Sequence, residues 1–162
     1  MVDGKKAGGT RWGAVFLGWA VAVLAGLVLS PLLRLLYTSL SEPAVGRGEL
    51  TATLVVISLV AGFLSYLIGG YVAARAAGHS GGKHGALTAV FGLLVGLALA
   101  VVLGLFGIVF AEGAALPPVG FGLAGAALLA GFILFLTNLF GGFVGGKLGE
   151  SPDAGGTRQG PG

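Results

Sequence analysis

Long apolar stretches alternate with short polar or charged segments along the chain. Four of the apolar stretches exceed the roughly 18–20 residues that an α-helix needs to cross the core of a bilayer. The pattern predicts transmembrane helices over about 13–36, 51–75, 85–111 and 119–147. The fold class that follows is all-α integral membrane, with four transmembrane helices.

Segments rich in glycine, proline and charge separate the apolar stretches and form both ends of the chain. Such composition is typical of loops and of disordered tails. We therefore expect disordered ends over 1–10 and 150–162 and a short loop over 78–84. The Pro117-Pro118 pair is expected to lead into the last helix, because proline suits the first turn of a helix.

The two halves of the chain carry similar residues at a common shift of about 72 positions, which indicates an internal duplication. The matching segments are Arg11–Val15 with Lys83–Leu87, and Phe63–Arg75 with Phe135–Lys147. The prediction is two tandem helical hairpin repeats, over 11–77 and 85–149. Each repeat holds two spans, so the two hairpins should cross the membrane in the same direction.

The composition makes lipid the main solvent of this chain. Hydrophobic residues are 56% and charged residues 9%, with a mean hydropathy of +1.00, whereas soluble domains carry about 25% charged residues. Glycine accounts for 33 of the 162 residues, and close helix packing in lipid is a use that explains so many. Cysteine is absent, which excludes disulfides, thiol nucleophiles and cysteine metal sites.

Lysine and arginine gather on one side of the predicted topology. That side collects Lys5, Lys6, Arg11, Arg75, Lys83, Lys147 and Arg158, and the other side collects Arg34 and Arg47. The positive-inside rule therefore places both termini and the 78–84 loop in the cytoplasm. The bases sit singly at helix ends and form no basic stripe, so no nucleic-acid partner is expected despite the net charge of +3.

Every predicted span carries small residues four positions apart, which line up along one face of a helix. Such ridges let two backbones approach closely, and this packing drives helix association in lipid. The alternative is a glycine- and alanine-rich composition that scatters small residues at random. The glycines predicted to pack helices are Gly18, Gly26, Gly69, Gly70, Gly92, Gly96, Gly104, Gly141, Gly142 and Gly145. Gly69 and Gly141 occupy matching positions, so we expect them to play equivalent roles.

Few side chains within the spans could carry chemistry. Asn138 is the most polar residue inside a span, and an interhelical hydrogen bond is favoured over a contact with a substrate. His79 and His84 flank a glycine-rich segment, but no carboxylate or cysteine lies nearby in sequence to complete a metal site. No catalytic, cofactor-binding or metal-binding set is predicted, so no enzyme activity is expected.

Bases and aromatic residues are expected to form a belt at the cytoplasmic interface. The belt consists of Arg11, Arg75, Lys83 and Lys147, together with Tyr71 and Phe143. Such a belt anchors helix ends at the level of the lipid headgroups. Binding of anionic lipid headgroups would extend that anchoring role.

The segment Gly69–Arg75 begins Gly-Gly-aromatic and ends in a base, and Gly78 and Lys83–Leu87 follow it. These residues resemble motifs of the YrzE-like group of small four-helix bacterial membrane proteins. The resemblance covers the four spans and not the tails. It implies a multi-pass protein of the bacterial plasma membrane, and it transfers neither an activity nor functional residues.

The expected function is a non-enzymatic integral membrane protein that serves as a glycine-ridge helix-packing or interaction scaffold. The alternative is an oligomeric small permease or pore component, in which polar faces would turn inward. The expected partners are the lipid bilayer with its anionic headgroups, and either a second copy of the chain or another membrane protein.

Overall fold

The computed structural model describes residues 9–40, 52–110 and 121–150, and these residues form four helices. The helices are α1 (Trp12–Leu40), α2 (Ala52–Ala77), α3 (Gly81–Phe110) and α4 (Phe121–Gly149). Each is long and apolar enough to cross a membrane. Residues 1–8 and 151–162 of the predicted tails and the segment around Pro117-Pro118 lie outside the described residues.

The start of α3 differs from the prediction, because the helix begins at Gly81, about one turn earlier than expected. Gly78 has a φ of 72° and Ser80 a φ of 48°, left-handed conformations that reverse the chain immediately after α2. The amide of His84 then donates to the carbonyl of Ser80 at 3.2 Å. The loop expected over 78–84 is therefore a shorter turn, and Lys83 lies on the helix.

Contacts along the helices give their relative directions. Gly18 lies against Gly69 and Gly26 against Ser65, so α1 and α2 are antiparallel, and Gly81 against Gly146 and Gly85 against Gly142 make α3 and α4 antiparallel. The contacts between α2 and α4 are Phe63 with Gly141, Leu67 with Gly145, and Tyr71 with Gly149. Both numbers rise together in these pairs, so α2 and α4 run parallel at the centre of the molecule.

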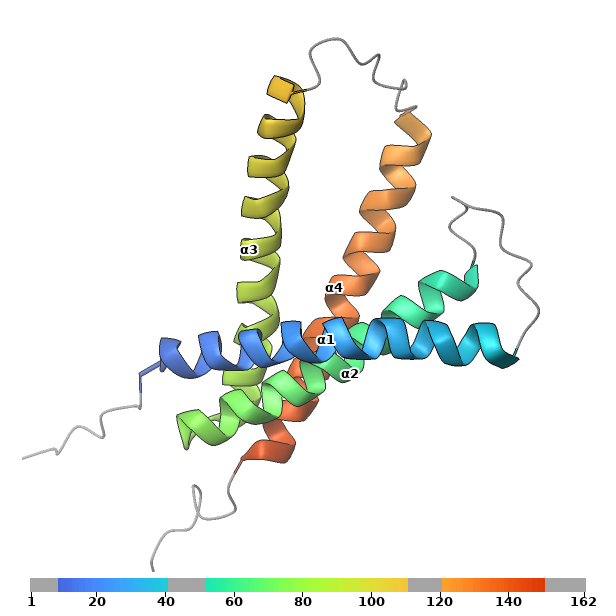
Figure 1. The fold of residues 1–162 in the computed structure, drawn as a ribbon. Coiled ribbons are helices and arrows are strands. Elements are labelled where there is room, and N and C mark those ends of the chain that lie inside the picture. Colours follow the sequence, from blue (N-terminus) through green and yellow to red (C-terminus); the bar gives the residue numbers. More distant parts are fainter. Residues whose placement is uncertain (1–8, 41–51, 111–120, 151–162) are drawn as a thin grey trace, which may run out of the picture.

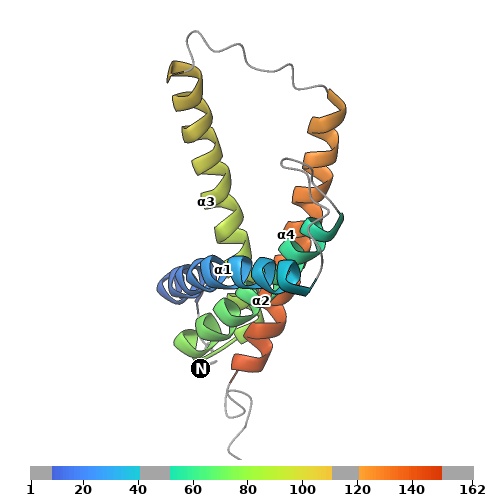
Figure 2. The same cartoon turned by 45° about the vertical axis from the view of Figure 1, so that its right-hand side comes forward.

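The α1–α2 pair runs steeply across α3 and α4, and the two pairs meet near one end of each and spread apart toward the other (Figure 1). We call the first end the packed end; it holds the starts of α1 and α3 and the ends of α2 and α4, near Trp12, Gly81, Ala77 and Gly149. The remaining ends form the open end, where α3 and α4 lie apart from each other and from the α1–α2 pair (Figure 2).

The buried side chains are small, and the large apolar side chains face outward. The buried hydrophobic residues are Ala14, Val15, Ala22, Ala61, Ala73, Ala74, Ala77 and Ala89. Leu27, Leu35, Leu94, Leu128 and Phe140 are among the many large side chains left more than half exposed. In water such a surface would aggregate. In lipid it is the expected surface, because close backbone packing of small residues takes the place of an aliphatic core.

The matching glycines of the two halves contact different helices. Gly69 of α2 faces the carbonyl of Gly18 and the side chain of Ala22 in α1. Gly141 of α4 faces the carbonyl of Phe63 in α2, across the boundary between the hairpins. The expectation of equivalent roles is therefore wrong, because the two glycines contact different partner helices. Both glycines do lie at helix contacts.

Candidate functional site

Glycines close the interface between α2 and α4 at the packed end. A Cβ atom added at Gly141 would lie 2.5 Å from the carbonyl oxygen of Phe63. A Cβ atom at Gly145 would overlap the carbonyl of Leu67, and one at Gly70 would overlap that of Gly142. The backbones are therefore in direct contact at these positions, and any side chain would force the helices apart.

A second set of glycines holds α1 against α2 and α3 against α4. A Cβ atom at Gly18 would lie 2.6 Å from both the Cβ of Ala73 and the carbonyl oxygen of Gly69. In the other hairpin, the Cα of Gly85 lies against the carbonyl of Gly142, and the Cα of Gly142 lies against the carbonyl of Gly85. Gly142 thus contacts both α2 and α3, at the point where the two hairpins meet.

The remaining predicted packing glycines lie closer to the open end, where contacts become sparse. A Cβ atom at Gly26 would be 3.4 Å from the Oγ of Ser65, an ordinary contact, and Gly92 lies against the hydroxyl of Tyr66. Nothing lies within 4 Å of a Cβ atom at Gly96, so this glycine takes no part in packing within the chain. The surroundings of Gly104 lie outside the described side chains.

An aromatic cluster joins α1 to α3 directly above the glycine contacts. The ring of Phe91 in α3 meets the ring of Phe16 edge-on at 6.2 Å between centroids and that of Trp19 edge-on at 5.5 Å. These large rings occupy the space where a ridge of small residues would otherwise have allowed backbone contact. The cluster therefore marks the level at which close packing gives way to divergence.

His84 is the largest fully buried side chain at the packed end, with 1% of its surface exposed. Its Nε2 accepts a hydrogen bond from the backbone amide of Arg11 at 3.1 Å, and its Nδ1 lies 3.1 Å from the carbonyl oxygen of Ser80. A nitrogen that accepts carries no proton, so Nδ1 is the protonated nitrogen and donates to Ser80. The neutral imidazole thus links the start of α1 to the α2–α3 turn.

Arg11 and His79 complete this junction around the end of α2. The guanidinium of Arg11 donates to the carbonyls of Ala76 at 3.4 Å and Ala77 at 3.2 Å, where a cation also complements the helix dipole. The ring of His79 packs edge-on against that of His84 with centroids 5.2 Å apart. Its nitrogens face the carbonyls of Ala77 and Gly9.

The histidine pair has the geometry of a structural junction. Each ring nitrogen already faces a backbone group. Among the described residues no group of three or more histidine, aspartate or glutamate side chains lies together. A structural metal site needs about four such ligands, so the residues present do not fit one.

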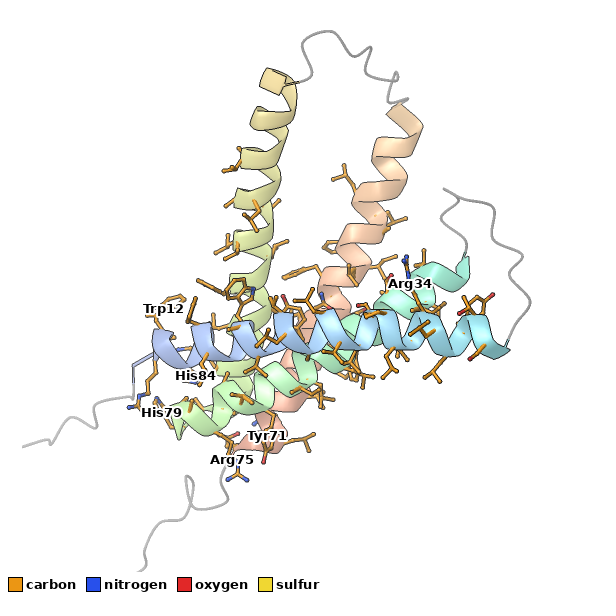
Figure 3. The ribbon with its side chains drawn as sticks, in the orientation of Figure 1. Trp12, Arg34, Tyr71, Arg75, His79 and His84 are labelled. Atoms are coloured by element: carbon orange, nitrogen blue, oxygen red, sulfur yellow. The ribbon has the colours of Figure 1, made fainter. Side chains whose placement is uncertain are left out.

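The other members of the predicted cytoplasmic belt are exposed at the packed end, and Figure 3 shows Tyr71 and Arg75 among them. Arg75 donates to the hydroxyl of Tyr71 at 3.0 Å, and its guanidinium lies 5.4 Å from the centre of that ring. Lys147 forms an ion pair with Glu150 at 3.6 Å. Lys83 projects from the first turn of α3. All four predicted bases therefore lie at one end of the molecule, and Arg34 lies toward the other.

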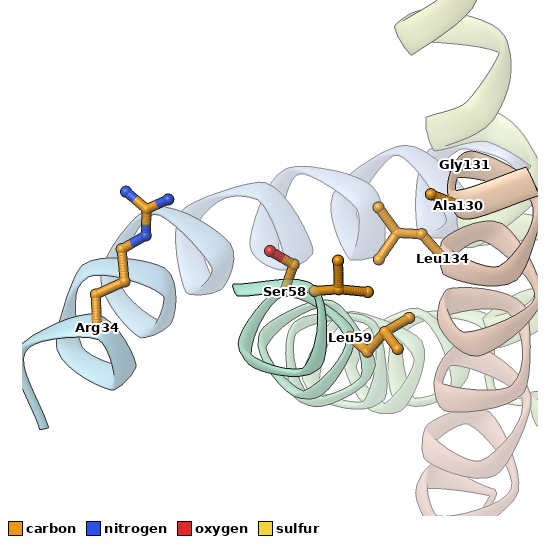
Figure 4. A pocket seen from close by; sticks show the side chains of 7 residues that line it. Arg34, Ser58, Leu59, Ala130, Gly131 and Leu134 are labelled. Atoms are coloured by element: carbon orange, nitrogen blue, oxygen red, sulfur yellow. The ribbon is translucent and has the colours of Figure 1, made fainter. Parts of the chain in front are cut away.

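Three adjoining cavities, of about 230, 240 and 300 Å³, lie where the hairpins begin to diverge. Leu134 of α4 lines all three, Ser58 lines the first and third, and both Tyr66 and Asn138 line the second and third. We call the three together the inter-hairpin cleft. It is bounded by all four helices, and its first cavity extends to Arg34 (Figure 4).

Asn138 and Tyr66 form the deep end of the cleft. The Oδ1 of Asn138 is buried without a hydrogen-bond partner. It lies directly against Gly62 of α2, a placement that suits a weak Cα–H···O contact. The predicted interhelical bond of Asn138 is thus replaced by contact with a glycine backbone. Side chains of Ser30, Ser65 and Tyr66 add polar groups around this point.

Sequence reasoning missed the cleft and the junction for different reasons. The cleft depends on the divergence of the hairpins, and the apolar pattern along the sequence does not contain the angle between helices. The junction was missed because His84 was placed in a loop. A signal was present in the match of Lys83–Leu87 to Arg11–Val15, since Arg11–Val15 leads directly into a helix and its counterpart should do the same.

No protein-family model, no curated protein and no solved structure matches the chain. The resemblance to the YrzE-like group thus remains a prediction from the glycine and base motifs.

Proposed function

We propose that this chain is a non-enzymatic integral membrane protein that acts as an interaction module, with the inter-hairpin cleft as its binding element. The observation that carries the proposal is the division of the four helices into two parts. Glycine contacts lock the packed end, and the same helices diverge beyond the aromatic cluster to leave a cleft. A rigid base with an open upper part is suited to holding another molecule within the bilayer.

The side chains of the cleft support binding and give no support to catalysis. Its described polar groups are serine hydroxyls, the Tyr66 hydroxyl, the Asn138 amide and the Arg34 guanidinium. A nucleophile needs an adjacent base to activate it, and the described lining contains no histidine or carboxylate. The two histidines lie at the packed end and are engaged with backbone groups.

The proposal includes the membrane in which the chain lies and the duplication from which its two hairpins arose. The chain would lie in a bacterial plasma membrane with both termini in the cytoplasm, as the distribution of lysine and arginine favours. Its two hairpins would be tandem copies inserted in the same direction, which the parallel run of α2 and α4 supports. The duplicated pair would have diverged, since Gly69 and Gly141 contact different helices.

Site-specific photocrosslinking tests the interaction module. A diazirine amino acid at Leu134 faces the cleft, and the same residue at Leu129, which is 60% exposed, faces outward on the same helix. We expect Leu134 to give one discrete adduct in intact membranes and Leu129 to give a diffuse mixture. Identical adduct patterns at the two positions would overturn the proposal, as would a defined catalytic turnover by the purified protein.

A second candidate function is a small permease or pore component. It is favoured by the polar groups that meet at the deep end of the cleft, from Ser30, Ser65, Tyr66 and Asn138. These groups would pass a neutral polar solute, and assembly of several copies would be needed to enclose a path. Swelling of proteoliposomes in small polyols would support it. A monomeric sample that leaves the liposomes sealed would exclude it.

A further inference from the structure

We propose that the inter-hairpin cleft holds one anionic phospholipid, with its phosphate at Arg34 and an acyl chain running inward toward Tyr66 and Asn138. This inference rests on the proposed function and names the occupant of the same cleft.

The walls of the cleft match a hydrocarbon chain. In the cavity nearest the open end, Val55 and Leu59 of α2 face Ala130 and Leu134 of α4. Leu134 also lines the two deeper cavities, so the three cavities adjoin at this side chain. A cleft of this kind opens into the hydrocarbon of the bilayer, where lipid chains are the most abundant molecules to fill it.

Measured along the helices, the cleft spans roughly half the length of a segment that crosses the hydrocarbon core. Arg34 lies roughly 33 Å along α1 from Trp12, at about 1.5 Å per residue. Tyr66 lies roughly 16 Å along α2 from Ala77 on the same scale. The two helices start level at the packed end, since Arg11 bonds the carbonyls of Ala76 and Ala77. The difference, roughly 17 Å, is about half of the ~30 Å hydrocarbon core.

The deep end of the cleft has a floor. The Asn138 side chain crosses from α4 to Gly62 of α2, and the Tyr66 hydroxyl crosses from α2 to Gly92 of α3. Between these crossings and the packed end, the glycines bring the helix backbones into direct contact. An acyl chain entering at Arg34 would therefore stop at these two crossings.

Arg34 supplies the headgroup contact. It is exposed on α1 and, among the described residues that line the cleft, it is the charged one. A long side chain at this height can extend to the membrane interface. The guanidinium binds phosphate through two parallel hydrogen bonds and carries a permanent charge, so it favours a lipid with a net negative charge.

A transmembrane helix fits the cleft less well than a lipid chain. A helix with its side chains is about 10–12 Å wide, so one leaflet's length of it occupies more than roughly 1,000 Å³. The cavities measure about 230, 240 and 300 Å³. A single acyl chain is narrower than a helix, so it needs less widening of the space between the hairpins.

Native mass spectrometry of the full chain tests the proposal. Protein is released from vesicles of equal phosphatidylglycerol and phosphatidylcholine, and the bound lipid is identified and counted. We expect wild-type protein to retain one phosphatidylglycerol per chain. Arg34→Gln should weaken that retention about tenfold and remove the preference over phosphatidylcholine, as loss of one charge-assisted contact would. Lys6→Gln, which removes a base that belongs neither to the cleft nor to the predicted cytoplasmic belt, is the control and should behave as wild type.

A second variant separates the chain site from the headgroup site. Leu134→Trp fills the wall common to all three cavities and should abolish retention of both lipids. Leu129→Trp, on the outward side of α4, should not. Retention that is unaffected by Arg34→Gln, or absent from wild type, would overturn the lipid proposal. A protein adduct at Leu134 in the crosslinking experiment would overturn it too, while leaving the interaction module standing.

Discussion

At Gly85 and Gly145 a Cβ atom would overlap a carbonyl of a neighbouring helix, whereas nothing lies within 4 Å of one at Gly96 or Gly131. The four glycines share two helices and similar local sequence, and only their neighbours differ. The first pair is required for backbone contact. The second pair is a cost to the helix, since glycine is about 1 kcal/mol less favourable than alanine in a helix interior.

Alanine substitutions therefore have opposite expected effects within one helix. Gly85→Ala in α3 and Gly145→Ala in α4 should lower stability by about 1–3 kcal/mol, the usual cost of overpacking. Gly96→Ala and Gly131→Ala should be neutral or stabilise by up to about 1 kcal/mol. Thermal unfolding in detergent measures all four. If the two pairs shift the midpoint equally, glycine contacts do not hold the packed end together.

The ridges show what residue spacing can and cannot predict. Gly92 and Gly96 belong to the same predicted ridge, yet only Gly92 meets a neighbour, the Tyr66 hydroxyl. The spacing of small residues identifies one face of the helix. Up to the level of Phe91, that face is the one that packs against a neighbouring helix. Beyond it the contact depends on the angle between helices. The bulk of Phe16, Trp19 and Phe91 affects that angle, and the sequence of one helix does not contain it.

His84 is the other residue whose removal should affect stability. His84→Leu removes the hydrogen bond that the amide of Arg11 donates and the side-chain bond to Ser80, whose carbonyl still accepts from the backbone amide of residue 84. Loss of an intramolecular hydrogen bond typically costs about 0.5–1.5 kcal/mol. We expect a lower unfolding midpoint in detergent. His79→Leu is the control, because His79 is only partly buried, and it should cost less. An equal loss for the two variants would show that the buried bonds of His84 add nothing.

At the scale of elements, the existence of four helices follows from apolar length alone, and their ends follow from local bonds. Apolar runs predict α1, α2 and α4 to within a few residues. The start of α3 was not predicted, because the glycines and the charge in Gly81–His84 are typical of a loop. In the structure Gly81 and Gly82 face Gly146 and Lys147 of α4, so glycines that weaken an isolated helix serve here to bring α3 onto α4.

The end of α2 provides a prediction at this scale. Arg11→Gln removes the cation that bonds the carbonyls of Ala76 and Ala77 and should lower stability by about 0.3–1 kcal/mol, as loss of a favourable dipole contact does. Hydrogen exchange should show faster opening in the last turn of α2. Lys147→Gln, which removes a base from the last turn of α4, is the control and should leave the last turn of α2 protected.

At the scale of the whole molecule, the structure gathers the bases that the sequence assigns to the cytoplasm. Arg11, Arg75, Lys83 and Lys147 lie at the packed end, although they come from four different helix ends. Arg34 lies toward the open end of α1. The charged end and the closely packed end of the molecule are therefore the same end. Under the orientation that we propose, the open cleft faces the leaflet opposite the cytoplasm.

Cysteine labelling tests that orientation. The chain has no cysteine of its own, so single cysteines can be introduced at Ser41, after α1, and at Ser80, in the exposed turn between α2 and α3. On intact cells an impermeant thiol reagent should label Ser41→Cys and not Ser80→Cys, and both should react after the cells are opened. Seven bases against two favour this result, because the membrane holds lysine and arginine on its cytoplasmic side. The reverse pattern would place the packed end outside, and the lipid held at Arg34 would then belong to the cytoplasmic leaflet.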